Sequence, residues 1–180
     1  MTIDEKLKAF FEGKKVVILG FGREGRSTLK LLGNCNCKSI TVADMNPVPE
    51  SEAEGCTLCC GEDYLTCLDD CDVIMKAPGV ILKSIVSDEI KAKITSQTDL
   101  FLRFCDNMII GITGTKGKST TSSLIKFFIE KSGKDTMLIG NIGVPPLERV
   151  RNLQRIVLSY VKCPVISLNM SRHRQMWRYC

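Results

Sequence analysis

Residues 111–121, which read Gly-Ile-Thr-Gly-Thr-Lys-Gly-Lys-Ser-Thr-Thr, constrain this chain more than any other stretch. An apolar run, 108–110, precedes them, and a helix-like run, 119–131, follows. A strand, a glycine loop, a lysine and a helix in this order build a phosphate cradle. Loop glycines let backbone N–H groups turn toward an anion, and the helix N-terminus adds partial positive charge. Lys118 can reach the outer phosphates and Ser119 can ligate Mg²⁺, so the stretch predicts a nucleoside triphosphate site.

The spacing of this loop departs from the general P-loop pattern. Gly117, Lys118 and Ser119 fit the end of the pattern, but Ile112 stands where its first glycine belongs. The alternative reading is a glycine turn that only begins a helix, with Ser119 or Thr115 as the N-cap residue.

A second glycine loop follows the apolar run 15–20. Its residues 20–25 match G-x-G-x-x-G, and Asp44 ends the next apolar run. In a dinucleotide fingerprint the first glycine permits a tight turn, Gly22 lets the backbone approach a phosphate, and Gly25 allows close helix–strand packing. Asp44 would accept hydrogen bonds from a ribose or a base edge. The alternative is a glycine turn that serves packing alone.

Strands and helices alternate along the chain, which predicts a parallel α/β sheet with right-handed crossovers. We expect a Rossmann-like domain over residues 1–106 and the start of a P-loop domain, with about two strands, over 107–180. The expected strands of the first domain are 15–20, 38–44, 55–60, 72–76 and 93–97. Its expected helices are 2–12, a helix after Gly25 to about Leu32 (stopped by Gly33 and Asn34), 63–69, 84–92 and 98–104, the last capped by Thr98.

Composition narrows the classes of protein and partner. The content of hydrophobic residues is 44%, which suits a packed core. No window approaches the ~18 apolar residues of a membrane span, and the N-terminus lacks the layout of a signal peptide. We therefore expect a cytoplasmic protein without a membrane partner.

Ten cysteines admit two readings. The spacing of Cys56 and Cys59, followed by Cys67 and Cys71, resembles a zinc-binding pattern. The alternative, which we prefer, is that these thiols are reduced and serve as small buried hydrophobic groups.

Charge is placed unevenly. Residues 149–180 hold seven Lys or Arg and no Asp or Glu, whereas the other 148 residues hold 18 basic and 20 acidic side chains. A basic tail could bind RNA, although we expect no nucleic-acid partner. His173 is the only histidine, and we interpret it as an exposed tail residue.

Four motifs occur in the order GFGREG (20–25), KAPGV (76–80), GITGTKGKSTT (111–121) and GNIGVP (140–145). Over residues 10–150 this series resembles the Mur ligase family. Folylpolyglutamate synthases carry a similar second loop but generally lack the first domain. The resemblance implies an ATP- and Mg²⁺-dependent ligase of peptidoglycan precursor synthesis. ATP would phosphorylate the carboxylate of UDP-N-acetylmuramoyl-L-alanine, and the amine of D-glutamate would attack the acyl phosphate.

The resemblance also implies roles for individual residues. Lys118 would offset charge on the transferring phosphoryl group, and Ser119 would hold Mg²⁺. The implied ATP-binding residues are Gly114, Thr115, Lys116, Gly117, Lys118, Ser119 and Thr120. The implied substrate-binding residues are Gly22, Arg23, Glu24 and Gly25 at the diphosphate, Asp44, Met45 and Asn46 near the uracil, then Pro78, Gly79 and Asn141.

The resemblance ends before the end of the chain. The family next carries a strand ending in a Glu-Leu-Ser-Ser-like motif whose glutamate holds a metal ion, but no carboxylate follows Glu148 here. We therefore expect an incomplete, catalytically inactive fragment, monomeric, with a marginally stable 108–180 segment. The competing hypothesis is an NAD(H)- or nucleotide-binding regulatory module.

Overall fold

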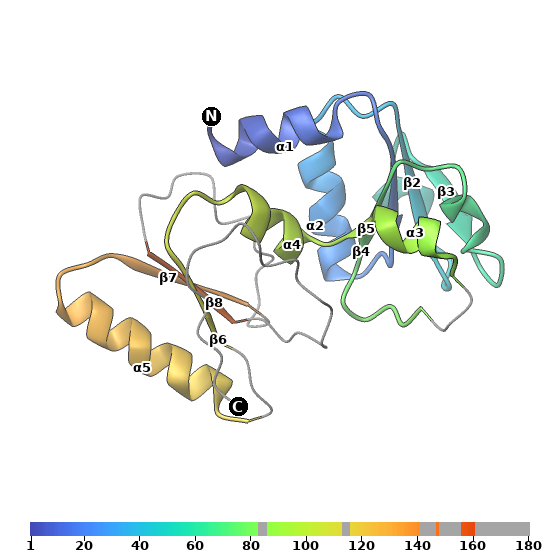
Figure 1. Cartoon of the computed structure of the whole chain (residues 1–180). Helices are drawn as coiled ribbons and strands as arrows, with labels where there is room; N and C mark the ends of the chain where they lie inside the picture. The colour runs from blue at the N-terminus through green and yellow to red at the C-terminus, as the bar shows by residue number, and fades with distance from the viewer. Residues whose placement is uncertain (83–85, 113–115, 141–146, 148–155, 161–180) are drawn as a thin grey trace. The chain divides into compact units, whose positions relative to one another are not determined.

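The computed structural model describes residues 1–82, 86–112, 116–140, 147 and 156–160 (Figure 1). Its contacts divide the chain into a first unit, Met1–Phe104, and a second unit, Cys105–Cys180. Within the described residues, no helix is both long and apolar enough to cross a bilayer.

The first unit contains a parallel sheet of five strands in the order β3-β2-β1-β4-β5 (Figure 1). The strands are β1 (Lys15–Leu19), β2 (Ser39–Asp44), β3 (Thr57–Cys60), β4 (Val73–Lys76) and β5 (Ile94–Thr95). Four of the five residues of the central strand β1 are buried, as expected where helices cover both faces of a parallel sheet. The strand order reverses between β1 and β4. This architecture confirms the predicted Rossmann-like fold.

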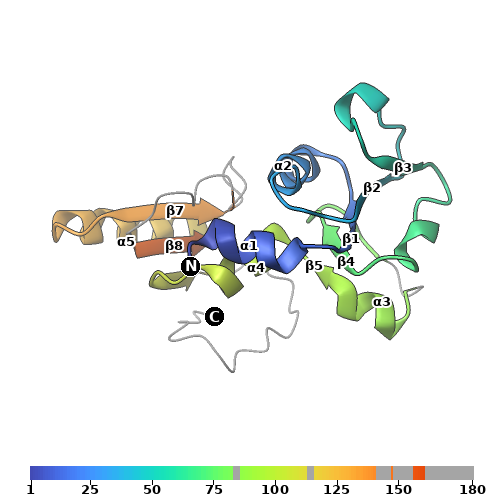
Figure 2. The ribbon, with the colours of Figure 1, turned by 90° about the horizontal axis from the view of Figure 1, so that it is seen from above.

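Helices cover both faces of this sheet (Figure 2). One face carries α2 (Arg23–Leu32), with α1 (Ile3–Phe11) and α4 (Gln97–Phe104) packed together beside it. The other face carries α3 (Asp88–Lys93) and the 3₁₀ turn η2 (Thr66–Leu68). The apolar cluster on that second face includes Leu19, Leu68 and Ile74, with Ile90 of α3 packed against it.

Several element boundaries differ from the sequence prediction. The helix expected at 63–69 is only the short turn η2, and a further 3₁₀ turn, η1 (Glu50–Glu52), was not predicted. The strand expected at 93–97 ends at Thr95, because Ser96 already accepts the Asp99 N–H at 3.1 Å and so opens α4. Ser96, rather than Thr98, therefore acts as the cap. Gly33 ends α2 in the right-handed region, with φ −58°, so no left-handed glycine is needed there.

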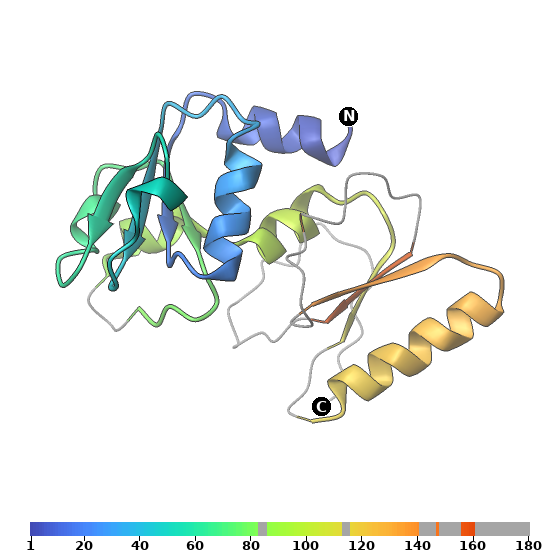
Figure 3. The ribbon, with the colours of Figure 1, turned by 180° about the vertical axis from the view of Figure 1, so that it is seen from behind.

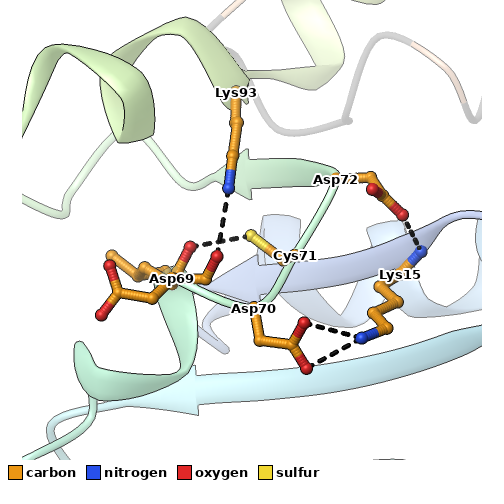
Figure 4. Close-up of polar contacts among 7 residues, drawn as sticks. Lys15, Asp69, Asp70, Cys71, Asp72 and Lys93 are labelled. Carbon is orange, nitrogen blue, oxygen red and sulfur yellow. Dashed lines mark hydrogen bonds and ion pairs between the residues drawn. The ribbon is translucent and has the colours of Figure 1, made fainter.

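A polar network closes the amino end of the sheet (Figure 4). Lys15 donates its Nζ to both carboxylate oxygens of Asp70 at 2.6 and 2.8 Å, and its backbone N–H to Asp72 at 2.8 Å. Lys93 donates to the backbone carbonyl of Asp69 at 3.1 Å. These bonds join the start of β1 to the segment before β4. They lie at the end of the sheet opposite to the glycine loop.

The second unit contains a parallel sheet in the order β6-β8-β7, with α5 packed against it (Figure 3). Its elements are β6 (Ile109–Ile112), α5 (Lys118–Lys131), β7 (Thr136–Gly140) and β8 (Ile156–Tyr160). The prediction of about two strands was wrong, because the run 156–160 forms a third strand between the other two. Its Ile-Val-Leu-Ser-Tyr sequence is rich in residues that favour strands.

Candidate functional site

The first glycine loop lies at the carboxyl end of β1, where the strand order reverses. Gly20 has φ +92°, and a Cβ there would lie 2.6 Å from Val80 Cγ2 and 3.0 Å from Ala77 Cβ. Both its conformation and its surroundings therefore require glycine. A Cβ at Gly25 would lie 2.2 Å from the Gly20 carbonyl oxygen, so the first turn of α2 packs directly on the loop.

Asp44 fastens this loop to the end of β2. Its Oδ2 accepts the Phe21 N–H at 2.6 Å, and its Oδ1 accepts the Asn46 N–H at 2.8 Å. Both carboxylate oxygens thus hold backbone in place. Met45 is 65% exposed, and Asn46 is exposed beside it. The structure therefore brings the predicted uracil-site residues together next to the glycine loop.

The N-terminus of α2 faces this loop without a side-chain cap. Gly22 is the N-cap residue, and a Cβ there would meet no atom within 4 Å. By contrast, Thr2 caps α1 and Ser87 caps α3 through hydroxyl groups. Uncapped N–H groups at the start of a helix suit an anion. Arg23, in the first turn, is exposed.

Sequence reasoning missed Arg26, which closes the loop from α2. Its guanidinium donates to the Phe21 carbonyl at 2.6 Å and to Glu52 at 2.7 Å, and it lies over the Phe21 ring. Arg26 lies five residues after Phe21, and this spacing matches no sequence motif that would have predicted the contact. Next to η1, an open hollow is lined by Glu50 and Glu54, whose charges disfavour a phosphate.

Glu24 points to a different environment from the one predicted. It is half-buried and, together with Lys76 and Gln97, lines a narrow recess that has no room for a water molecule. Burial raises the pKa of Glu24, and the Lys76 charge opposes this shift. Pro78 and Gly79, two and three residues beyond Lys76, are exposed. The Glu24 and Lys76 side chains therefore line the same recess beside α4, close enough for each charge to affect the pKa of the other.

The second glycine loop begins α5. Gly117 is the N-cap residue with φ +74°, and no side chain caps the helix. Its first turn contains no acidic residue. Lys118 is half-exposed, and Lys116, Ser119 and Thr120 are exposed. This arrangement favours an anion at the helix N-terminus.

Parts of the predicted site lie outside the described residues, namely Gly114, Thr115 and Asn141. Because Gly117 is the N-cap residue of α5, the expectation of Thr115 or Ser119 as the N-cap was wrong, and Ser119 lies inside the helix. The tail around His173 is also outside them.

The cysteines in the described part of the chain carry free thiols. Burial, with a hydrogen bond to Cys59, raises the pKa of Cys67 to about 12. Cys71 is buried in the apolar cluster and donates to the Leu68 carbonyl at 3.1 Å. No group of three or more potential metal-ligating side chains occurs among the described residues.

No protein-family model matches the chain. Curated proteins that share one name do match it. A UDP-N-acetylmuramoylalanine–D-glutamate ligase of Clostridium botulinum (strain Loch Maree / Type A3) is 32% identical over 179 residues, covering 92% of this chain and 39% of the relative. The ligase of the same name from Shouchella clausii (strain KSM-K16) is 33% identical over 139 residues, covering 73% of this chain and 31% of the relative.

The chain thus spans about two fifths of the length of the curated relatives it matches. The matched part of those relatives is N-terminal. The chain belongs to the Mur ligase family, and it corresponds to the N-terminal portion of UDP-N-acetylmuramoylalanine–D-glutamate ligases.

Proposed function

We propose that this chain is the nucleotide-handling part of an ATP-dependent ligase that joins D-glutamate to UDP-N-acetylmuramoyl-L-alanine. The first unit would bind the uridine diphosphate group of the acceptor, and the second unit would bind ATP. The observation that carries this proposal is the similarity to the named ligases across 92% of the chain.

The geometry of the first loop supports the nucleotide-diphosphate assignment. Gly22 leaves open space at an uncapped helix N-terminus, and Asp44 holds the neighbouring backbone. Because this loop stands at the reversal of strand order, it occupies the position where such sheets bind ligands. Met45 and Asn46 are exposed beside it and would contact the uracil.

The geometry of the second loop supports ATP. Lys118 would bind the outer phosphates, and an acid-free first turn leaves the helix N-terminus positive. The exposed Ser119 hydroxyl fits one position in the coordination of Mg²⁺, which would neutralise phosphate charge. In phosphoryl transfer, positioning and charge neutralisation supply most of the catalysis, and these are the tasks assigned to Lys118.

We also propose that residues 1–180 alone bind nucleotides without completing ligation. Supporting this, residues 149–180 contain no carboxylate for a metal site. Incubating the chain with ATP, Mg²⁺, the UDP-linked acceptor and D-glutamate should release no phosphate above background. Amide product would contradict the proposal.

A titration distinguishes the ligase from an NAD(H)-binding module. We expect the chain to bind UDP and UDP-N-acetylmuramoyl-L-alanine, measured by isothermal titration calorimetry, and to bind NAD weakly or not at all. Binding of NAD at micromolar concentrations, without binding of UDP compounds, would support the rival function.

The ATP assignment is tested at Lys118. The substitution Lys118→Ala should weaken ATP binding about tenfold or more, because a charge-assisted contact is lost. Lys131→Ala, at the other end of the same helix, removes the same charge and should leave ATP affinity unchanged. Equal affinities of the two variants would contradict a phosphate contact by Lys118.

A further inference from the structure

Lys76 is a positive side chain at the carboxyl edge of the first sheet. It is the last residue of β4 and pairs in register with Leu19 of β1. The next residue, Ala77, donates its N–H to the Leu19 carbonyl at 2.9 Å and lies against Gly20. Lys76 therefore stands beside the glycine loop, where the strand order reverses.

The ammonium group of Lys76 is held in a partly buried setting. Its Nζ donates to the Ala77 carbonyl at 3.2 Å. The negative charge of Glu24 favours the charged form of Lys76. Burial lowers the pKa of Lys76 and raises that of Glu24, while each charge partly offsets the shift of the other. Removing charges from water is unfavourable, and side chains with shifted pKa values cluster at functional sites.

The side-chain amide of Gln97, which lines the same recess, has an unpaired oxygen. Gln97 is 1% exposed, and its Nε2 donates to Glu24 O, Ser27 Oγ and Thr28 Oγ1 at 3.2, 3.2 and 2.9 Å. Its Oε1 has no hydrogen-bond partner among the described residues. Buried polar atoms are nearly always paired, so an unsatisfied acceptor beside two charged side chains marks this recess as unusual.

Arg26, a further cation close to the loop, serves a different purpose. Arg26 is bonded to both the Phe21 carbonyl and the Glu52 carboxylate, so its guanidinium holds the loop from outside. Among its described hydrogen bonds, Lys76 has only the Ala77 carbonyl as acceptor. An ammonium group has three N–H donors, so Lys76 can turn toward a new oxygen ligand.

We propose that Lys76 binds the phosphate oxygens of a nucleoside diphosphate at the first glycine loop, and that Glu24 is its counter-ion in the absence of ligand. This inference rests on the proposed function of the first unit. It assigns a phosphate contact to a strand-terminal lysine outside the G-x-G-x-x-G pattern. It also makes Glu24 the partner of a cation. A position at the diphosphate would instead place its negative charge beside negative phosphates.

The test compares UDP with uridine, which lacks the phosphates, as ligands of the full 180-residue chain. Affinities are measured by isothermal titration calorimetry for the parent, Lys76→Gln and Lys76→Arg. The matched control is Lys38→Gln, an exposed lysine just before β2, at the opposite end of the sheet. Circular dichroism checks the fold, and Lys76→Met replaces Lys76→Gln if that variant does not fold.

We expect Lys76→Gln to weaken UDP binding about ten- to a hundredfold and to leave uridine binding unchanged. Lys76→Arg should retain most of the UDP affinity, and Lys38→Gln should behave as the parent. Unchanged UDP affinity of Lys76→Gln, or an equal loss for UDP and uridine, would overturn this inference but leave the proposed function in place. A parent chain that binds neither ligand would overturn the proposed function and this inference with it.

Discussion

At the scale of single residues, the glycines of the first loop fulfil different requirements. Gly20 needs its left-handed backbone and its lack of a side chain, whereas Gly25 needs only the missing side chain. Gly22 is restricted by neither, because its φ is −74° and the space around it is open. The pattern G-x-G-x-x-G therefore combines two structural positions with one that is open for a ligand.

Gly25→Ala should destabilise the first unit by about 1–3 kcal/mol, because its Cβ would meet the Gly20 carbonyl oxygen and backbone must move. Gly22→Ala, the matched control, should stay within about 1 kcal/mol of the parent. Urea unfolding followed by circular dichroism measures both. Similar stabilities of the two variants would show that the loop relaxes freely around residue 25.

The thiols should differ in reactivity according to their burial. Cys67, with its pKa raised to about 12, holds almost no thiolate at mildly alkaline pH, whereas Cys60 is exposed. Iodoacetamide should therefore modify Cys60 well before Cys67, as followed by peptide mass spectrometry. Equal rates at the two residues would indicate that β3 and η2 separate readily in solution.

Sequence reasoning singled out the glycines and Asp44, which lie together in the structure, but not Lys76 and Arg26, which also lie beside the first glycine loop. Glycine spacing is a local pattern that backbone geometry imposes, so it can be read directly. The placement of Lys76 depends on the register of β4 against β1, and that of Arg26 on the contact with Glu52. Both contacts join residues distant in sequence, which a local pattern does not encode.

At the scale of elements, an exposed ion pair between Lys15 of β1 and Asp70 joins the amino end of the first sheet to the segment before β4. The hydrogen bond from Lys15 lowers the pKa of Asp70, so the fold favours the ionised carboxylate. The resulting stabilisation is present above the unfolded-state pKa and is lost as pH falls through the folded-state pKa, which lies below 3.8. Both side chains meet solvent, so the contribution is small.

Asp70→Asn should lower the free energy of unfolding slightly at neutral pH, and its difference from the parent should disappear at strongly acidic pH. Asp69→Asn is the control, because Asp69 accepts its hydrogen bond from Lys93 through its backbone carbonyl. Urea midpoints of both variants across the acidic range measure the effect. A difference that persists at the lowest pH would exclude the carboxylate charge as its origin.

Among the elements, long apolar runs were predicted more accurately than short ones. The strands β1, β2 and β4 and the helices α1 and α2 lie within about one residue of expectation at most ends, since burial imposes a clear pattern. The short β5 and α3 and the turn η2 deviate further. Local side-chain hydrogen bonds, such as the one that the Asp99 N–H donates to Ser96, decide where these elements end. Neighbouring polar residues could make equivalent bonds, so a sequence pattern does not show which of them forms the cap.

At the scale of the whole molecule, the two units differ in the burial of those apolar side chains that the structure describes. The first unit buries Phe11, Ile18, Leu32 and Ile74 completely. Among the side chains that the structure describes in the second unit, the buried apolar ones are Ile112 and Leu147. In α5, Leu124, Phe127 and Phe128 are each more than half exposed.

The second unit should therefore unfold at lower urea concentration than the first, in a separate step. Amide hydrogen exchange followed by mass spectrometry should show slow exchange in β1 and β4 and faster exchange in β6 and β7. A single cooperative transition with uniform protection would contradict this. It would show that the units stabilise each other.

The position of β8 has a consequence for how the protein is made. β8 is the last of the three strands in sequence, yet it lies between β6 and β7 and pairs with both. During synthesis, β6 and β7 emerge before the strand that joins them. At about 5–20 residues per second, roughly 1–4 s separate the ribosomal addition of Gly140 from that of Tyr160, and during this interval the segments of β6 and β7 lack the strand that joins them.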